Sequence, residues 1–128
     1  MKGKLNSEKE SVPTKGEMEV LKILWQHGPS TVRFVHDTLN KQKEAVQYTS
    51  TLKLMQVMAE KGVVERDETN MKHVYSAALA EENTKKAMLD RFVDSIYDGS
   101  ASNLMLALLD DKTSKEELKK IKEMLKQI

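Results

Sequence analysis

The fold of this chain follows from one stretch of its sequence, Tyr48-Thr-Ser-Thr-Leu-Lys-Leu-Met-Gln-Val-Met-Ala-Glu-Lys-Gly-Val-Val64. Small or apolar residues recur at Thr51, Met55 and Met58, which is the spacing of one helical face. Gly62 tolerates the left-handed conformation that commonly ends a helix, and two β-branched residues follow it directly. The stretch therefore predicts a helix that ends at Gly62 and leads at once into a strand.

The residues after this helix predict a pair of short strands. Partial alternation of apolar residues indicates a strand at Val63 to Arg66, a polar turn at Asp67 to Met71 and a return strand at Lys72 to Ala77. Two strands around a polar tip, directly after a helix, are typical of the wing of a winged helix.

Two further helices are predicted before this stretch. The segment Thr14-Lys-Gly-Glu17 matches a capping box, in which the Thr and Glu side chains each satisfy a free backbone amide at the helix start. This first helix stops at Gly28-Pro29, and Ser30 or Thr31 caps a second helix. The residues expected to face the core are Met18, Leu21, Leu24 and Trp25 in the first helix and Val32, Val35 and Leu39 in the second. Three helices followed by a two-stranded wing predict a winged helix-turn-helix.

The second half of the chain predicts helices alone. They cover Glu81 to Tyr97, Ser100 to Leu109, and a last segment that a second capping box opens at Ser114. About 50 residues are too few to build a well-filled core on their own, so the apolar stripes of these helices are expected to meet a second copy in a homodimer. The residues expected at this dimer interface are Met88, Phe92, Ile96, Leu104, Leu108, Leu118, Ile121 and Leu125.

The predicted fold class is mainly α with a small two-stranded β wing. With 128 residues the chain has room for one ordinary domain, or for a small domain plus an oligomerising tail. We expect residues 1–12 to form a flexible arm, residues 13–79 a winged-helix DNA-binding domain, and residues 80–128 a helical dimerisation region.

The composition excludes several classes of protein. Apolar residues make up 39% of the chain and charged residues 32%, so the chain can bury a core. It has no cysteine, which excludes disulfides and thiol-based sites and favours a reducing compartment. The N-terminus lacks an apolar signal segment, and the longest uncharged run, Gly99 to Leu109, is too short for a bilayer. We therefore expect a cytoplasmic protein without membrane insertion.

The sequence shows no catalytic constellation. It has no glycine-rich phosphate loop, no helix with paired zinc-binding histidines and no nucleophile elbow. His27, His36 and His73 are isolated in the sequence, and metal ligands normally come in clusters, so these histidines are interpreted as surface or structural residues. We expect neither enzymatic activity nor a cofactor or metal.

The polar face of the helix that starts near Gln47 is the strongest candidate for a functional site. Hydroxyl groups and a lysine on such a face can bond phosphates and base edges in the major groove of double-stranded DNA. The expected DNA-binding residues are Gln47, Tyr48, Thr49, Ser50 and Lys53 on this helix, Lys43 in the connector before it, and Lys72 and His73 at the wing.

The net charge leaves a second interpretation open. It is only +1, and the segment up to Leu79 holds twelve Lys and Arg against ten Asp and Glu, whereas many nucleic-acid binders are strongly basic. Any affinity for DNA must come from where the cations lie. The alternative is a winged-helix module that binds another protein and has no DNA-binding activity.

The order of motifs resembles the penicillinase-repressor family over nearly the whole chain. The resemblance is carried by Thr14-Lys-Gly-Glu-Met-Glu-Val-Leu-Lys-Ile-Leu-Trp25, Tyr48-Thr-Ser-Thr-Leu52, Glu60-Lys-Gly-Val-Val64 and Tyr75. The first two motifs are fairly specific, whereas the third occurs in many winged-helix families. The resemblance implies a repressor whose winged helix binds a palindromic operator as a dimer, with the dimer formed by three C-terminal helices. Carried over by position, its recognition residues are those already expected on the helix after Gln47.

The resemblance also implies how repression ends. In the family a membrane-bound sensor with a zinc-protease domain relieves repression, and the repressor is cleaved in a region that corresponds here to Leu104 to Leu109. The best-known members are cut between Asn and Phe, where this chain has Ala107-Leu108. A second departure is Val57, which stands where many members carry a basic residue in the recognition helix.

Overall fold

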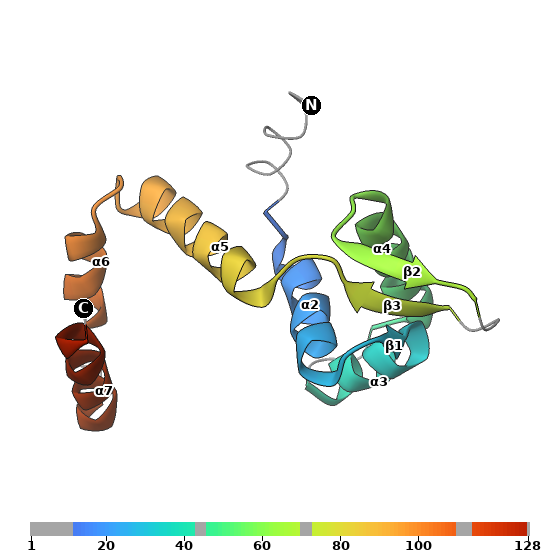
Figure 1. The fold of residues 1–128 in the computed structure, drawn as a ribbon, viewed down its shortest axis with the longest axis horizontal. Coiled ribbons are helices and arrows are strands. Elements are labelled where there is room, and N and C mark those ends of the chain that lie inside the picture. The colour runs from blue at the N-terminus through green and yellow to red at the C-terminus, as the bar shows by residue number, and fades with distance from the viewer. Residues whose placement is uncertain (1–11, 43–45, 70–72, 110–113, 128) are drawn as a thin grey trace. The chain divides into compact units, whose positions relative to one another are not determined.

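The computed structural model describes residues 12–42, 46–69, 73–109 and 114–127 (Figure 1). The expected arm, residues 1–12, lies outside these ranges except for its last residue. The elements in chain order are α2 (Lys15–His27), β1 (Ser30–Thr31), α3 (Val32–Gln42), α4 (Tyr48–Glu60), β2 (Val64–Asp67), β3 (Val74–Ala77), α5 (Glu81–Ile96), α6 (Ala101–Leu108) and α7 (Lys115–Lys126). The described part is thus mostly helical with a small antiparallel sheet, which confirms the predicted fold class.

The chain divides into two compact units, Met1–Met88 and Leu89–Ile128. The division falls inside α5, whereas the sequence placed the domain boundary before that helix. Thr84, in the first turn of α5, is buried, and its hydroxyl donates to the Ala80 carbonyl oxygen at 2.8 Å. The first unit, which extends to Met88, includes these first turns of α5.

The start and end of α2 are determined by local chemistry. The Thr14 hydroxyl accepts from the Glu17 amide at 3.2 Å, and the Thr14 amide donates to the Glu17 carboxylate at 3.0 Å. These two bonds confirm the predicted capping box. Gly28 ends the helix with a φ of 81°, a conformation that other residues rarely adopt, and its amide donates to the Leu24 carbonyl oxygen at 2.8 Å.

Glu17 also joins the start of α2 to the end of α4. Its side chain is 4% exposed, and its carboxylate accepts from Lys61 Nζ at 2.7 Å. Burial raises the pKa of Glu17, but the hydrogen bonds from Lys61 and Thr14 together outweigh it, so the pKa lies below the ordinary value of 4.5. The contact therefore stabilises the fold only while Glu17 is ionised.

We expect Lys61→Ala to lower the free energy of unfolding by about 1–3 kcal/mol at neutral pH, because it leaves a buried carboxylate without its charged donor. A carboxyl group whose folded pKa is lowered stabilises the protein above its unfolded value and loses that effect as the pH falls through the folded pKa. Urea unfolding of wild type and variant should thus show a difference at pH 7 that shrinks on acidification below 4.5.

Lys22, an exposed residue of α2, provides the charge-matched control for Lys61→Ala. Lys22→Ala removes the same charge and is expected to leave stability within about 0.5 kcal/mol of wild type. A Lys61→Ala effect of the same size at every pH would contradict the role given to Glu17.

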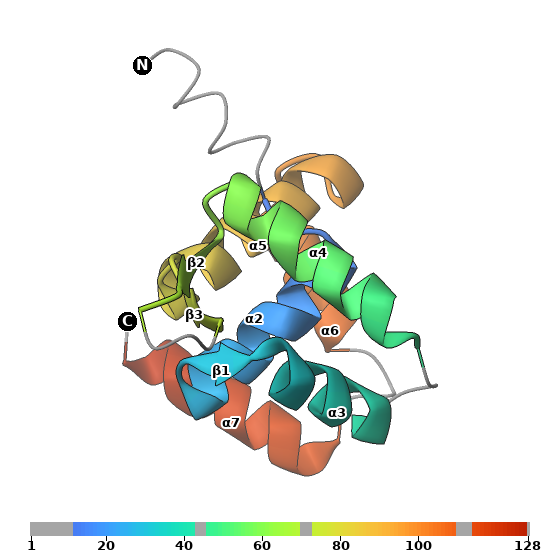
Figure 2. The same ribbon diagram turned by 90° about the vertical axis from the view of Figure 1, so that its right-hand side faces the viewer.

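The core of the first unit lies where α2, α3 and α4 meet the sheet (Figure 1 and Figure 2). Its buried apolar residues are Val20, Leu21, Ile23, Leu24, Val32, Val35, Leu39, Met55, Met58, Val63, Val64 and Tyr75. The predicted stripes of α3 and α4 are therefore confirmed. The prediction for α2 is confirmed but incomplete, because Val20 and Ile23 are also buried, while Met18 and Trp25 pack against the margin of the core. Trp25 remains anchored there, since its Nε1 donates to the Leu79 carbonyl oxygen at 2.9 Å.

The sheet holds one strand more than the sequence predicts. The strand order is β1-β3-β2, and both pairings are antiparallel, with Val64 opposite Ala77 and Ser30 opposite Tyr75. The two predicted strands of the wing are confirmed, with β2 one residue later than expected and β3 beginning at Val74 instead of Lys72. Residues 70–72, which include the end of the predicted turn, lie outside the described residues. β1 was predicted only as a helix cap, and a two-residue strand has no periodicity that could reveal it. Thr31 belongs to β1 and also caps α3, because its hydroxyl accepts from the Phe34 amide at 3.1 Å.

The second unit consists of helices that leave many apolar side chains exposed. Ser100 caps α6 by accepting from the Asn103 amide at 3.2 Å, and Ser114 caps α7 by accepting from the Glu117 amide at 3.1 Å, which is the serine half of the predicted box. Large apolar residues that are exposed in this unit are Leu89, Phe92, Ile96, Leu106, Leu108, Leu109, Met124 and Leu125. Within the described ranges, none of the helices is both long and apolar enough to cross a membrane.

Candidate nucleic-acid interface

The exposed face of α4 carries most of the predicted recognition residues. Because Thr51, Met55 and Met58 turn into the core, the opposite face of the helix points to solvent. The predicted residues found exposed at this end of α4 are Gln47, Thr49, Ser50 and Lys53, and Gln56 is exposed one turn further along. Gln47 is the N-cap residue and makes no side-chain cap bond in the described structure. The face thus presents hydroxyl, amide and ammonium groups together.

Tyr48 differs from this pattern because its ring contacts two residues of α3. The ring is half-buried and lies edge-on to His36, with centroids 5.3 Å apart and an interplanar angle of 82°. The Arg33 guanidinium carbon lies 4.3 Å from the centre of the same ring. Tyr48 is therefore held in place by α3, whereas the sequence predicted an outward-pointing side chain.

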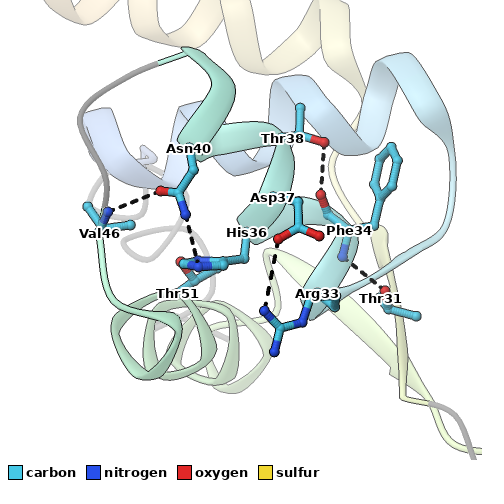
Figure 3. A network of polar contacts seen from close by, with 9 residues as sticks. All are labelled: Thr31, Arg33, Phe34, His36, Asp37, Thr38, Asn40, Val46 and Thr51. Carbon is cyan, nitrogen blue, oxygen red and sulfur yellow. Dashed lines mark hydrogen bonds and ion pairs between the residues drawn. The ribbon is translucent and has the colours of Figure 1, made fainter.

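A chain of polar contacts fixes the start of α4 against α3 (Figure 3). The Val46 amide donates to Asn40 Oδ1 at 3.0 Å, Asn40 Nδ2 lies 3.0 Å from His36 Nε2, and His36 Nδ1 lies 2.9 Å from the Thr51 hydroxyl. Since Asn40 Oδ1 already accepts, its amide nitrogen must donate to His36. Nε2 of the imidazole is then an acceptor, and Nδ1 carries the proton that is donated to Thr51.

His36 is accordingly a structural residue, as the sequence suggested. It is 6% exposed and has a partner for each ring nitrogen. Among the described residues, no group of three or more His, Asp or Glu is placed to hold a metal ion.

A cleft of about 390 Å³ lies between the first turn of α3, the start of α4 and the β2–β3 hairpin. Among the described residues that line it, two are arginines and none is acidic. The polar lining residues are Thr31, Arg33, Tyr48, Gln56, Arg66, His73 and Tyr75. The cleft therefore brings the predicted wing residue His73 to the same region as α4.

The two arginines of the cleft differ in how firmly they are held. Arg66 contacts the Glu68 carboxylate, and its hydrogen bond to Tyr75 raises the pKa of the guanidinium against the effect of desolvation. Arg33 pairs with Asp37 across 3.9 Å, and both side chains are more than half exposed. Exposed pairs of that length contribute little, so the Arg33 guanidinium can exchange Asp37 for a stronger anion.

Sequence reasoning missed Arg33, Gln56 and Arg66. Gln56 could have been predicted from the sequence, because it follows Lys53 by three residues and shares its helical face. Arg33 and Arg66 could not have been predicted in this way, because only the tertiary structure places them beside α4. Val57 is half-buried, and the predicted contacts Lys43 and Lys72 lie outside the described residues.

The predicted dimerisation residues occupy both sides of the division between the units. Met88 is the last residue of the first unit, and the others belong to the second. Phe92, Ile96, Leu108 and Leu125 are exposed in the single chain, and Leu104, Leu118 and Ile121 are half-buried. The predicted cleavage residues, Ala107 and Leu108, are exposed and end α6.

Nearly the whole chain is similar to a known protein family. The family model described as penicillinase repressor matches residues 13–127. No curated protein matches the chain. The family match extends from the capping box of α2 through the exposed face of α4 to the last turn of α7.

Proposed function

This chain belongs to the penicillinase repressor family and is a DNA-binding transcriptional repressor, and we propose that it binds a palindromic operator as a homodimer. In this proposal α4 enters the major groove and the β2–β3 hairpin lies beside the sugar-phosphate backbone. The observation that carries the proposal is the exposed start of α4, with Thr49, Ser50 and Lys53 next to a cleft lined by two arginines. Local concentration of cations compensates for a net charge of only +1.

The dimer is proposed to form through the exposed apolar side chains of the second unit. Ile96 is 61% exposed and Leu108 50% exposed, which is unusual for large apolar residues that cluster on helices with a polar opposite face. A two-fold dimer would place two copies of α4 in major grooves about 34–36 Å apart, one turn of the double helix. Bound there, the dimer represses by blocking access of polymerase to the promoter.

Relief of repression is proposed to follow cleavage near Ala107-Leu108. The support is the family membership, and because Leu108 is also a proposed interface residue, the bond becomes accessible only when the dimer opens locally. The proposed partner for this step is a membrane-bound sensor with a metalloprotease domain. We expect no catalysis by the chain itself, because the family is a regulatory one.

We expect Lys53→Ala to weaken operator binding by about 1–3 kcal/mol and to relax specificity at one base pair, because Lys53 lies on the exposed face that enters the groove. Fluorescence anisotropy with a duplex from the chain's own promoter, and with single-base variants of it, measures both effects. Lys22→Ala removes the same charge from α2 and is expected to leave specificity unchanged.

Two other outcomes would separate the possible roles of Lys53. An equal loss on all duplexes would make it a phosphate contact instead of a base contact. Full retention of affinity and specificity would remove Lys53 from the interface.

A further inference from the structure

Arg33 and Tyr48 form a composite group at the mouth of the cleft. Arg33 is the second residue of α3, and Tyr48 is the first residue of α4, yet the guanidinium carbon lies 4.3 Å above the tyrosine ring. A guanidinium over an aromatic face is attracted to the ring quadrupole and keeps its donor edge free. The arrangement orients the Arg33 donors while leaving them accessible to a ligand.

The tyrosine ring also contacts a buried histidine of α3. His36 contacts it edge-on, and the orientation of His36 is set by its bonds to Asn40 and Thr51. Because these bonds are inside the first unit and His36 is buried, the ring has little freedom to turn away. The hydrogen bonds of His36 thus limit the movement of the Tyr48 ring, and the ring in turn limits the movement of the exposed Arg33.

The surroundings of Arg33 favour a phosphate group as its ligand. Among the described lining residues of the cleft, Arg66 and His73 add positive charge or donors, and no carboxylate is present. The nearby Asp37 is 57% exposed and 3.9 Å from Arg33, too weak a partner to compete with a bidentate phosphate. Arg66, in contrast, is already engaged by Glu68 and Tyr75.

We propose that Arg33, stacked on Tyr48, binds a phosphate of the operator backbone beside the groove that α4 enters. The inference rests on the proposed DNA-binding function and adds a contact outside the recognition face. Tyr48 then acts as a positioning residue for Arg33, in place of the base-reading role that the sequence suggested. A phosphate contact carries no sequence information, so its loss must be equal on specific and non-specific DNA.

The salt dependence of binding tests the phosphate contact. Each phosphate neutralised contributes about 0.9 to the slope of log affinity against log salt, so Arg33→Gln should lower the slope of a dimer by about 1.8. The affinity ratio of wild type to variant should then fall about tenfold between 50 and 200 mM salt. Full-length protein is titrated with a duplex of its own promoter and with a scrambled duplex of equal length.

Matched variants test whether the Tyr48 ring acts as a platform that positions Arg33. Tyr48→Phe keeps the ring and should bind as wild type does, whereas Tyr48→Leu removes the platform and should weaken binding as Arg33→Gln does. The double variant Arg33→Gln with Tyr48→Leu should lose no more than either alone, because the two residues act as one group. Asp37→Asn removes the competing carboxylate and should tighten binding, and Lys22→Gln is the control for charge alone.

The outcomes separate this inference from the proposed function. Specific promoter binding by wild type with an unchanged slope in Arg33→Gln would overturn the phosphate contact and leave the repressor function intact. A loss confined to one base pair would also overturn it. Additive losses in the double variant would refute the platform role of Tyr48, and no specific binding by wild type would refute the proposed function itself.

Discussion

Ending the chain after Met88 is expected to lower affinity for the full operator by about 10²–10⁴-fold while leaving a folded monomer. The loss arises because the truncated chain no longer forms a dimer. In the dimer, binding of one protomer keeps the second at high effective concentration over the neighbouring half-site. The cut is placed after Met88 because the first unit extends to that residue, and truncation at Leu79 would remove the first turns of α5 with the buried Thr84. Sedimentation and anisotropy on the truncated and full chains measure assembly and affinity together.

Point variants test the same claim in the intact chain. Leu108→Asp and Leu125→Asp place a charge at exposed apolar positions of α6 and α7, and an unpaired charge is costly to bury in a dimer interface. Both should therefore reproduce the truncation. Lys120→Asp, on the polar side of α7, is the matched control and should remain dimeric. A truncated chain that still sediments as a dimer would place the interface in the first unit.

Repression in vivo is expected to be lost when the chain is cut near Ala107-Leu108. Cleavage at the end of α6 separates α7 from the rest of the second unit and so removes the same avidity that truncation removes. Half-site binding is then too weak to compete with the excess of non-specific genomic DNA. Mass spectrometry of the repressor from induced cells should find fragments that end near Ala107.

The sequence at the scissile bond offers a matched variant for this prediction. Ala107→Asn combined with Leu108→Phe restores the pair found in the best-known members of the family and should be cleaved at least as fast as wild type. Full derepression with an intact chain would eliminate proteolysis as the off switch. Release would then require a ligand or another change in the repressor.

The elements with strong local signals were predictable from the sequence. The capping box at Thr14, the glycine at position 28 and the apolar period of α4 each depend on residues within a few positions of one another, and the structure shows them as expected. β1 was missed because two residues carry no period. The extra core residues of α2, Val20 and Ile23, were missed because the buried face of that helix extends further around it than the predicted stripe.

The candidate site was predictable only where it lies on a single helix. The outward direction of Thr49, Ser50 and Lys53 follows from the helical period of the buried residues of α4, which are Thr51, Met55 and Met58. The position of Arg33 above Tyr48 depends on how α3 packs against α4, across a gap of fifteen residues in the sequence. Nothing local in the sequence indicates that packing, so the contact and the cleft beside it required the structure.

The central claim is that the full-length chain is a sequence-specific DNA binder that occupies two half-sites as a dimer. The most direct measurement is a titration of the chain's own promoter duplex against a scrambled duplex at several salt concentrations, with footprinting of the complex. We expect binding at least about 10³-fold tighter to the promoter, a steep salt dependence, and two protected half-sites about one helical turn apart. Equal affinity for promoter and scrambled DNA, or the absence of any salt-dependent complex, would contradict the claim.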